Sequence, residues 1–179
     1  MHHLLSSKPF PCGLLGTIES IIGEQRFPST LTTLDVISNH KRLKEMVERG
    51  AKAAVMEVSS HALDQNRLAG LDFDAAIFTN FSQDHLDYHL TMDRYLEAKS
   101  KLFQIISDPK KTAIVNSDDP CFEKVIRFCK ATRITYGIEK DADVRAKEIE
   151  MSLKGTRFKL CFQGKEFIIK FNENIMLKF

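Results

Sequence analysis

The chain has 179 residues, of which 43% are hydrophobic and 28% are charged, and its formal net charge at pH 7 is +2. This length and apolar content suit one ordinary domain with a sizeable core, and the interspersed charges are not those of a disordered polyelectrolyte. The small net charge gives no electrostatic basis for nucleic-acid or membrane binding, and no apolar run reaches the roughly 18 residues that span a bilayer.

Short apolar runs recur along the first three quarters of the chain and predict strands. Each run is bounded by polar residues, glycine or proline, as is typical of buried strands. In chain order, the predicted strands are residues 12–18, 53–58, 74–79, 112–115 and 133–136.

Longer amphipathic stretches between these runs predict helices. Residues 33–49 place apolar side chains at roughly helical spacing and end before Gly50, a residue type that commonly stops a helix. Residues 91–106 give the strongest helix prediction, because their first residue is a threonine suited to the N-cap and an apolar stripe follows it. A third helix is predicted at residues 119–129, with a proline in its first turn.

This alternation of strands and helices predicts an α/β domain with a mostly parallel sheet flanked by helices over residues 1–137. The remainder, residues 138–179, instead alternates polar and apolar residues, which predicts a small antiparallel β appendage of the same domain. Its predicted strands are residues 144–153, 157–162 and 166–171.

The cysteines and the N-terminal residues both indicate a cytoplasmic protein. Cys12, Cys121, Cys129 and Cys161 form no C-x-x-C pair and lie in apolar surroundings, which favours reduced, buried thiols over a zinc site or a disulfide framework. The first residues lack the basic segment and apolar core of a signal peptide.

Reactive groups are concentrated after two of the predicted strands. The segment MEVSSHALDQNRLAG ends the strand at residues 53–58, and TNFSQDHLDYH follows the strand at residues 74–79. Ligands of open α/β sheets bind beyond the carboxyl ends of the strands, where both segments are expected to lie. Glu57 comes after four apolar residues, and burial of its carboxylate requires a partner or a metal. A solvent-facing Glu57 explains the same position equally well.

Two histidines of the second segment suggest a cation site. His85 and His89 are interleaved with acidic residues, but the pattern is not H-E-x-x-H, so a hard cation held by carboxylate and phosphate oxygens with one imidazole fits better than catalytic zinc. A histidine that only forms a structural hydrogen bond is a competing interpretation, more so for His89 than for His85. Lys99 on the predicted helix is, from the residues alone, interpreted as a solvated surface charge.

Several familiar motifs are absent from the 179 residues. The sequence contains neither G-x-x-x-x-G-K-[ST] nor G-x-G-x-x-G, so it has no recognisable phosphate cradle. Ser59, Ser60 and His61 are adjacent, but G-x-S-x-G is missing, which does not favour a hydrolase. From the residues alone, the prediction is an α/β domain with a cleft of acidic and histidine residues suited to metal-dependent chemistry.

The block VMEVSSHALDQNRLAGLDFDAAIFTNFSQDHLDYHLTMDRYLEAKSKLF resembles the signature block of UDP-N-acetylmuramoyl-tripeptide synthetases, members of the Mur ligase family. Further matches, from GLLGTIES and STLTTLDV to AIVNSDDP, TYGI, ADVRAKEI, GTRFKL and IIKFN, cover nearly the whole chain. The resemblance implies a central ATPase-type domain, similar in fold to P-loop NTPases. The implied enzyme is a ligase of peptidoglycan synthesis, and hence of cell-wall biogenesis, cell shape and cell division.

Such a ligase adds meso-diaminopimelate or L-lysine to UDP-N-acetylmuramoyl-L-alanyl-D-glutamate through an acyl phosphate, with ATP and Mg²⁺ as cofactors. By this resemblance the catalytic residues and magnesium ligands are Glu57, His85 and a carbamylated Lys99. The implied substrate-binding residues are Thr32, Thr33, Ser59, Gln65 and Arg67. The residues implied to lie near the base or ribose of ATP are Asn116 and Asp119.

The sequence departs from the family in ways that bear on activity. The P-loop expected before GLLGT is missing, the start MHHLLSSK resembles only the end of the helix that follows it, and Leu34 replaces the usual proline. The uridine-binding and amino-acid-binding domains of the family also find no counterpart here. We therefore interpret the chain as a domain fragment, truncated at its C-terminus and without ligase activity on its own. The full-length enzyme is expected to be monomeric.

Two alternatives stay open from the sequence. The first is another Mur or folylpolyglutamate-type ligase on the same scaffold, although SSHALDQNRLAG favours the tripeptide synthetase. The second is a degenerate, non-catalytic binding domain. In each case we expect neither a nucleic-acid partner nor a membrane partner.

Overall fold

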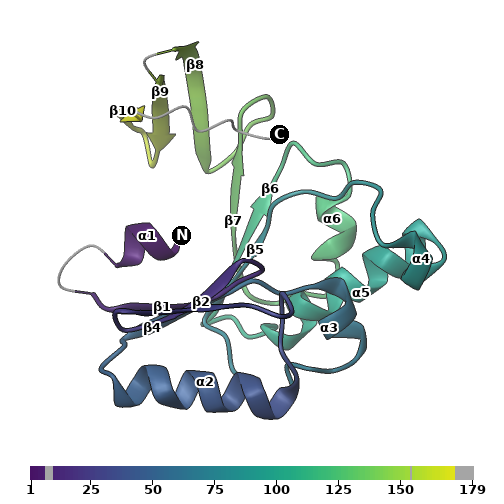
Figure 1. Ribbon diagram of the computed structural model, residues 1–179. Coiled ribbons are helices and arrows are strands. Elements are labelled where there is room, and N and C mark those ends of the chain that lie inside the picture. Colours follow the sequence, from purple (N-terminus) through teal and green to yellow (C-terminus); the bar gives the residue numbers. More distant parts are fainter. Residues whose placement is uncertain (7–9, 154, 172–179) are drawn as a thin grey trace. The chain divides into compact units, whose positions relative to one another are not determined.

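The structure is a computed structural model that describes residues 1–6, 10–153 and 155–171 (Figure 1). The chain divides into two compact units, of which unit 1 comprises Met1–Leu71 with Asp87–Lys101 and unit 2 comprises Asp72–Leu86 with Leu102–Phe179. The domain boundary predicted between residues 137 and 138 is a different division and stays a prediction. The end of the predicted appendage, residues 172–179, lies outside the described residues.

Unit 1 contains a four-stranded sheet in the order β3-β2-β1-β4. Strand β1 pairs in parallel with β4, so that Leu14 lies opposite Val55, and it pairs antiparallel with β2, which in turn pairs antiparallel with β3. The hairpin of β2 and β3 was not predicted, and Gly23 in its turn has a φ of 61°, which glycine adopts without strain. The strands are β1 (Cys12–Leu15), β2 (Glu19–Ile22), β3 (Gln25–Pro28) and β4 (Ala53–Met56).

Helix α2 (Val36–Glu48) covers one face of this sheet. Met46 on the helix is 1% exposed and packs with Leu15 and Ile22 of the sheet, forming the apolar core of unit 1. The helix begins three residues later than predicted because Asp35 caps it, accepting a hydrogen bond from the backbone N–H of Ser38 at 3.0 Å. Its C-terminal end is followed by a glycine in the left-handed region, as predicted.

The strongest helix prediction, residues 91–106, is confirmed as α5 (Met92–Ile105). Thr91 precedes it and accepts a hydrogen bond from the backbone N–H of Arg94 at 3.3 Å, as an N-cap does. Three shorter helices were not predicted, because four or five residues are too few for a periodic pattern. These are α1 (His2–Leu5), α3 (Ser60–Asp64) and α4 (Leu86–His89).

Unit 2 contains a six-stranded sheet in the order β10-β9-β8-β7-β6-β5. Neighbouring strands from β5 to β8 are parallel, and those from β8 to β10 are antiparallel, which confirms the predicted α/β class with an antiparallel appendage. The parallel pairs are divided between the two sheets, because β1 and β4 belong to the sheet of unit 1. The strands are β5 (Ala75–Phe78), β6 (Thr112–Asn116), β7 (Thr132–Gly137), β8 (Val144–Ser152), β9 (Gly155–Phe162) and β10 (Lys165–Phe171).

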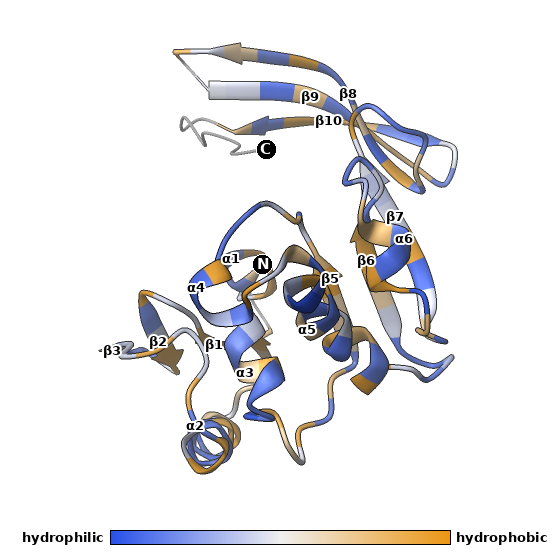
Figure 2. Cartoon of the chain, turned by 90° about the vertical axis from the view of Figure 1, so that its right-hand side faces the viewer, coloured by the Kyte–Doolittle hydropathy of each residue, from blue (hydrophilic) through white to orange (hydrophobic). Residues whose placement is uncertain are grey.

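The appendage strands β8 to β10 carry both hydrophilic and hydrophobic residues (Figure 2), but the predicted two-residue alternation is interrupted in β10, where Phe167, Ile168 and Ile169 are consecutive. Gln163 and Gly164 join β9 to β10, and both have positive φ angles, of 50° and 72°, as a tight hairpin turn requires. The pairing of β8 with β9 shifts register between Lys147 and Glu150, where Glu148 also has a positive φ.

The prediction of a helix over residues 119–129 was too long, since α6 spans only Phe122–Val125. The helix ends at Val125, four residues before the predicted end. Asp119 explains its later start, because its two carboxylate oxygens accept hydrogen bonds from the backbone N–H groups of Phe81 at 2.5 Å and Cys121 at 2.7 Å. Aspartate side chains that bond nearby backbone in this way compete with helix formation. Residues 119–121 therefore form a turn before the helix begins.

The four cysteines are free thiols, as predicted, but only Cys12 is buried, whereas Cys121, Cys129 and Cys161 are partly exposed. All four lie within the described residues, and burial raises the pKa of the Cys12 thiol. Within the described part of the chain, no helix combines the length and apolar character needed to cross a membrane.

A carboxylate in unit 2 holds the loop that follows β7. Asp118 accepts hydrogen bonds from the backbone N–H groups of Ile138, Glu139 and Lys140, at 2.6, 3.3 and 2.8 Å. Burial by itself raises the pKa of Asp118, but these three donors outweigh it and hold the pKa below its ordinary value of 3.8. The absence of a side chain at Gly137 leaves space for this carboxylate, because a Cβ there would lie 3.0 Å from Asp118 Oδ1.

We expect Asp118→Ala to lower the free energy of unfolding of the 179-residue chain by about 2 kcal/mol at pH 7, because hydrogen bonds to a charged group are lost. Since the folded pKa is lowered, this contribution is complete above pH 3.8 and is lost as the pH falls through the folded pKa. Urea denaturation across this range measures the effect. Asp141→Ala is the matched control, because Asp141 is fully exposed and forms an ion pair with Arg145 at 3.6 Å. A loss that is independent of pH, or equal in both variants, contradicts the prediction.

Candidate functional site

Glu57 follows β4 and is held in place by the residue that follows the neighbouring parallel strand. Its Oε2 accepts a hydrogen bond from the backbone N–H of Thr17 at 2.9 Å and lies 2.7 Å from the Thr17 hydroxyl. Because β1 and β4 are parallel neighbours, their carboxyl ends meet, and this brings the two residues together. Glu57 is exposed and yet anchored, so both interpretations of its position hold in part. Thr17 was not predicted from the sequence, although its position shortly after an adjacent strand was the available signal.

Thr33 joins the loop before α2 to the chain that leaves β4. Its side-chain hydroxyl donates to the backbone carbonyl of Glu57 at 2.9 Å and accepts from the backbone N–H of Ser59 at 3.0 Å. The residue is 1% exposed, so both of these backbone groups are satisfied by a buried side chain. The adjacent Thr32 reaches Thr17, with 3.1 Å between the two hydroxyl oxygens.

Arg67 extends this arrangement through its guanidinium group. Nη1 donates to the backbone carbonyl of Thr33 at 2.9 Å, while Nε and Nη2 donate to Oε1 of Gln65 at 2.9 and 2.5 Å. The backbone carbonyl of Arg67 accepts from Asn39 Nδ2, which also bonds Leu34. We call the resulting hydrogen-bonded group the Thr33 cluster. Its members are Thr17, Thr32, Thr33, Glu57, Ser59, Gln65 and Arg67.

The Thr33 cluster has the chemistry of a site for an oxygen-rich anionic ligand. It combines hydroxyl groups, an amide, a carboxylate and a guanidinium, and Glu57 and Gln65 are exposed to solvent. Arg67 makes three hydrogen bonds, which leaves further N–H donors of its guanidinium for a ligand carboxylate or phosphate. The structure thus brings together six of the sequence-predicted site residues in unit 1.

Lys99 lies on α5 and is half-buried, which is a departure from the solvated surface charge inferred from the residues alone. Its Nζ lies 5.1 Å from the centroid of the Tyr95 ring, and Tyr95 is 5% exposed. Carbamylation requires a neutral amine at this position. Carbamylation of Lys99 stays a prediction.

His85 belongs to unit 2 and adopts a positive φ of 53°. Its backbone N–H donates to Asp84 Oδ1 at 2.8 Å, and its ring Nε2 lies 3.4 Å from Asp84 Oδ2. The convergence of His85 with Glu57 and Lys99 on one magnesium ion stays a prediction. Among the described residues, no group of three or more His, Cys, Asp or Glu side chains is arranged to hold a metal ion. A carbamate or a substrate phosphate would add donors of other kinds.

His89 has a structural hydrogen bond, as the competing interpretation proposed. Its Nε2 lies 2.9 Å from the hydroxyl of Ser60, and both residues are buried. Its ring stacks on that of Tyr95, with 5.2 Å between centroids. His89 therefore helps to pack α3 and α5 within unit 1.

The two predicted ATP contacts, Asn116 and Asp119, lie in unit 2, where both side chains bond the backbone. Asn116 donates to the carbonyl of Thr79 at 2.8 Å and accepts from the N–H of Asp118 at 3.0 Å. Both carboxylate oxygens of Asp119 accept backbone hydrogen bonds, as described above. These contacts shape the loops after β5 and β6, and a role in binding ATP stays a prediction.

The sequence matches a family model and several curated proteins. Residues 1–174 match the family model described as the Mur ligase middle domain. The chain is 43% identical over 165 residues to a UDP-N-acetylmuramoyl-L-alanyl-D-glutamate–2,6-diaminopimelate ligase of Bacillus cereus, covering 89% of this chain and 34% of that protein. The chain thus spans about a third of the length of the curated relatives it matches.

The chain is also similar to solved protein structures. A structure described as a UDP-N-acetylmuramoyl-L-alanyl-D-glutamate–2,6-diaminopimelate ligase has a TM-score of 0.85 and 34% identity, covering 94% of this chain and 35% of that one. A structure described as an FPGS–AMPPCP complex has a TM-score of 0.64 and 15% identity, covering 92% of this chain and 47% of that one. The second likeness shows the fold alone.

Proposed function

We propose, since the chain belongs to the Mur ligase family, that it forms the central domain of an ATP-dependent ligase of peptidoglycan synthesis. That ligase joins an amino acid to UDP-N-acetylmuramoyl-L-alanyl-D-glutamate. Of the two amino acids considered from the sequence, 2,6-diaminopimelate is favoured because it stands in the names of the relatives. The Thr33 cluster carries the proposal, because it unites the implied substrate-binding residues in one hydrogen-bonded group.

The reaction we propose proceeds through an acyl phosphate. An oxygen of the D-glutamate carboxylate takes the γ-phosphoryl group of ATP and ADP leaves, after which the incoming amine attacks the carbonyl carbon, inorganic phosphate leaves and the nitrogen loses a proton. The main physical difficulty is the approach of two anions. Within the Thr33 cluster, Arg67 supports substrate binding by offering a planar cation, and Gln65 keeps that cation oriented.

The donor chemistry of this chain fits the Mg²⁺ that we propose for the reaction. Magnesium prefers oxygen ligands, and the Glu57 carboxylate is held in a fixed position by Thr17. A carbamate on Lys99 would present oxygens of the same kind, and His85 is the third proposed ligand. Bound Mg²⁺ would neutralise phosphate charge as the phosphoryl group is transferred.

ATP binding is proposed for this protein on the basis of its family, with Asn116 and Asp119 near the base or ribose. The 179 residues contain no P-loop motif to cradle the phosphates, so we propose that this polypeptide alone has no ligase activity. We further propose that the enzyme acts in the cytoplasm as a monomer. Nucleic acids and membranes are not among its proposed partners.

A phosphate-release assay tests the proposed function directly. The protein at its full natural length is expected to release phosphate only when ATP, Mg²⁺, UDP-N-acetylmuramoyl-L-alanyl-D-glutamate and 2,6-diaminopimelate are all present, and the 179-residue chain is expected to release none. Arg67→Ala should raise the KM for the UDP-linked substrate about tenfold or more, because a charge-assisted contact is lost, with the KM for ATP unchanged.

Arg49→Ala is the matched control for Arg67→Ala, because Arg49 at the end of α2 pairs with Glu45 outside the Thr33 cluster. Its kinetic constants should equal those of the unsubstituted protein. Absence of phosphate release from the full-length protein, or an unchanged KM in Arg67→Ala, would count against the proposal.

Carbamylation of Lys99 can be observed without any assay of activity. In the presence of ¹³C-bicarbonate, the protein at its full natural length is expected to show one carbamate carbon resonance that disappears in Lys99→Arg, because the guanidinium stays protonated and does not react. Lys101→Arg is the control and should keep the resonance, since Lys101 lies on the same helix and its Nζ is already paired with Asp64 at 2.7 Å. A resonance that survives in Lys99→Arg would rule out this assignment.

A further inference from the structure

We propose that Asp64, Tyr88 and Lys101 are positioning residues for the substrate site, acting on Arg67 through the side-chain amide of Gln65. None of the three was singled out from the sequence, all three lie in unit 1, and each comes from a different helix. The inference rests on the proposed function, because it takes Gln65 and Arg67 to contact the UDP-linked substrate.

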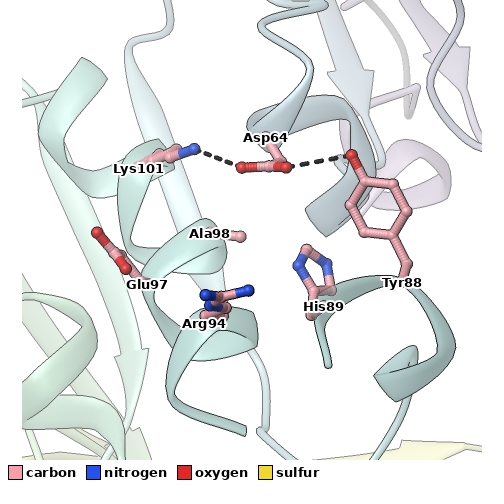
Figure 3. A pocket seen from close by; sticks show the side chains of 7 residues that line it. All are labelled: Asp64, Tyr88, His89, Arg94, Glu97, Ala98 and Lys101. Atoms are coloured by element: carbon pink, nitrogen blue, oxygen red, sulfur yellow. Dashed lines mark hydrogen bonds and ion pairs between the residues drawn. The ribbon is translucent and has the colours of Figure 1, made fainter. Parts of the chain in front are cut away.

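The three side chains meet at the C-terminal end of α3. Lys101 Nζ donates to Asp64 Oδ1 at 2.7 Å, and the hydroxyl of Tyr88 donates to Asp64 Oδ2 at 3.1 Å. Figure 3 shows the two donors approaching the carboxylate from opposite sides. The Tyr88 hydroxyl also accepts from Nε2 of Gln65 at 3.2 Å. A continuous chain of hydrogen bonds therefore runs from Lys101 to Gln65.

The chemistry of these groups fixes which group donates and which accepts at each hydrogen bond between Lys101 and Gln65. Hydrogen bonds from Lys101 and then from Tyr88 lower the pKa of Asp64, so that near neutral pH the carboxylate only accepts. The single proton of the Tyr88 hydroxyl is therefore committed to Asp64, and its lone pairs face the Gln65 amide. Gln65 must then present Nε2 to Tyr88 and Oε1 to Arg67, which is the orientation observed.

The ring of Tyr88 is held by contacts that do not involve its hydroxyl. Its centroid lies 4.2 Å from that of His61 and 4.8 Å from that of His89, in an edge-on arrangement with His89. His89 is itself buried and bonded to Ser60. Removing the hydroxyl alone should therefore leave the ring in place and free the Gln65 amide to rotate.

The exposure of this group argues for positioning over stabilisation. A pocket of about 480 Å³ is lined in part by Asp64, Tyr88 and Lys101, and the side chains of the ion pair are 42% and 38% exposed. Ion pairs exposed to this degree contribute little to stability. The main effect of this group is therefore expected on the orientation of Gln65 and Arg67.

Tyr88→Phe tests the proposal in the protein at its full natural length. We expect the KM for UDP-N-acetylmuramoyl-L-alanyl-D-glutamate to rise about fivefold, as for one lost neutral hydrogen bond, with the KM for ATP and the Tm unchanged. Glu97→Gln is the matched control, because Glu97 lines the same pocket and takes no part in the chain from Lys101 to Gln65, and it should behave as the unsubstituted protein.

A double-mutant cycle separates positioning from a general loss of packing. If Tyr88 acts only through Gln65, then Tyr88→Phe combined with Gln65→Ala should raise this KM no further than Gln65→Ala alone. Independent, multiplying effects overturn the proposal. If Tyr88→Phe lowers the Tm, Lys101→Met, which changes an exposed side chain, replaces it in the same cycle.

Two results distinguish failure of this inference from failure of the proposed function. If Tyr88→Phe leaves the KM unchanged while Arg67→Ala raises it, the positioning role is wrong and the substrate site stands. If neither variant changes the KM, the substrate site itself is wrong, and the positioning role falls with it.

Discussion

The buried hydroxyl of Thr33 is the contact on which the candidate site depends. It donates to the carbonyl of Glu57 and accepts from the N–H of Ser59, so it satisfies the backbone on both sides of Val58. Leaving such partly buried groups unpaired costs up to about 1–3 kcal/mol each. The loop before α2 and the chain leaving β4 are therefore fixed to each other by one side chain, and the functional groups of both segments are fixed with them.

The rest of the site extends from this contact in two directions. Toward the sheet, the parallel pairing of β1 with β4 lets Thr17 hold the carboxylate of Glu57. Toward the helices, the carbonyl of Thr33 accepts from Arg67, whose guanidinium is oriented by Gln65. A carboxylate suited to a cation and a guanidinium suited to an anion are thus held in one unit by a common framework of hydrogen bonds.

Periodicity in the sequence predicted the regular elements well and the short ones poorly. Helices α2 and α5 and the strands of the unit 2 sheet were predicted because their apolar residues recur at the spacing of the element. The hairpin of β2 and β3 was missed because β3 has the sequence QRFP, is mostly exposed and offers no apolar run. The late start of α6 was missed because Asp119 bonds the backbone of its own turn. Local side-chain bonds of this kind override helical spacing.

From the residues alone, Glu57 and His85 were candidates, whereas the other residues of the candidate site were predicted only through resemblance to the Mur ligase family, a membership that the comparisons confirm. From the residues alone, Lys99 was interpreted as a surface charge and Arg67 had no assigned role. Neither the residue patterns nor the family resemblance assigned a role to Thr17 or Tyr88, because their hydrogen-bond partners lie 40 and 23 positions away in the sequence. Contacts at such separations follow from the fold and leave no local pattern.

Binding of UDP-N-acetylmuramoyl-L-alanyl-D-glutamate to Thr33 variants tests the central claim most directly. Calorimetry on the protein at its full natural length should show that Thr33→Ser, which keeps the hydroxyl, binds with nearly the original affinity. Thr33→Val, which keeps the shape and removes the hydroxyl, should bind at least about tenfold more weakly while remaining folded. Equal affinity in the two variants would contradict the account, because the buried hydroxyl would then not hold the site together.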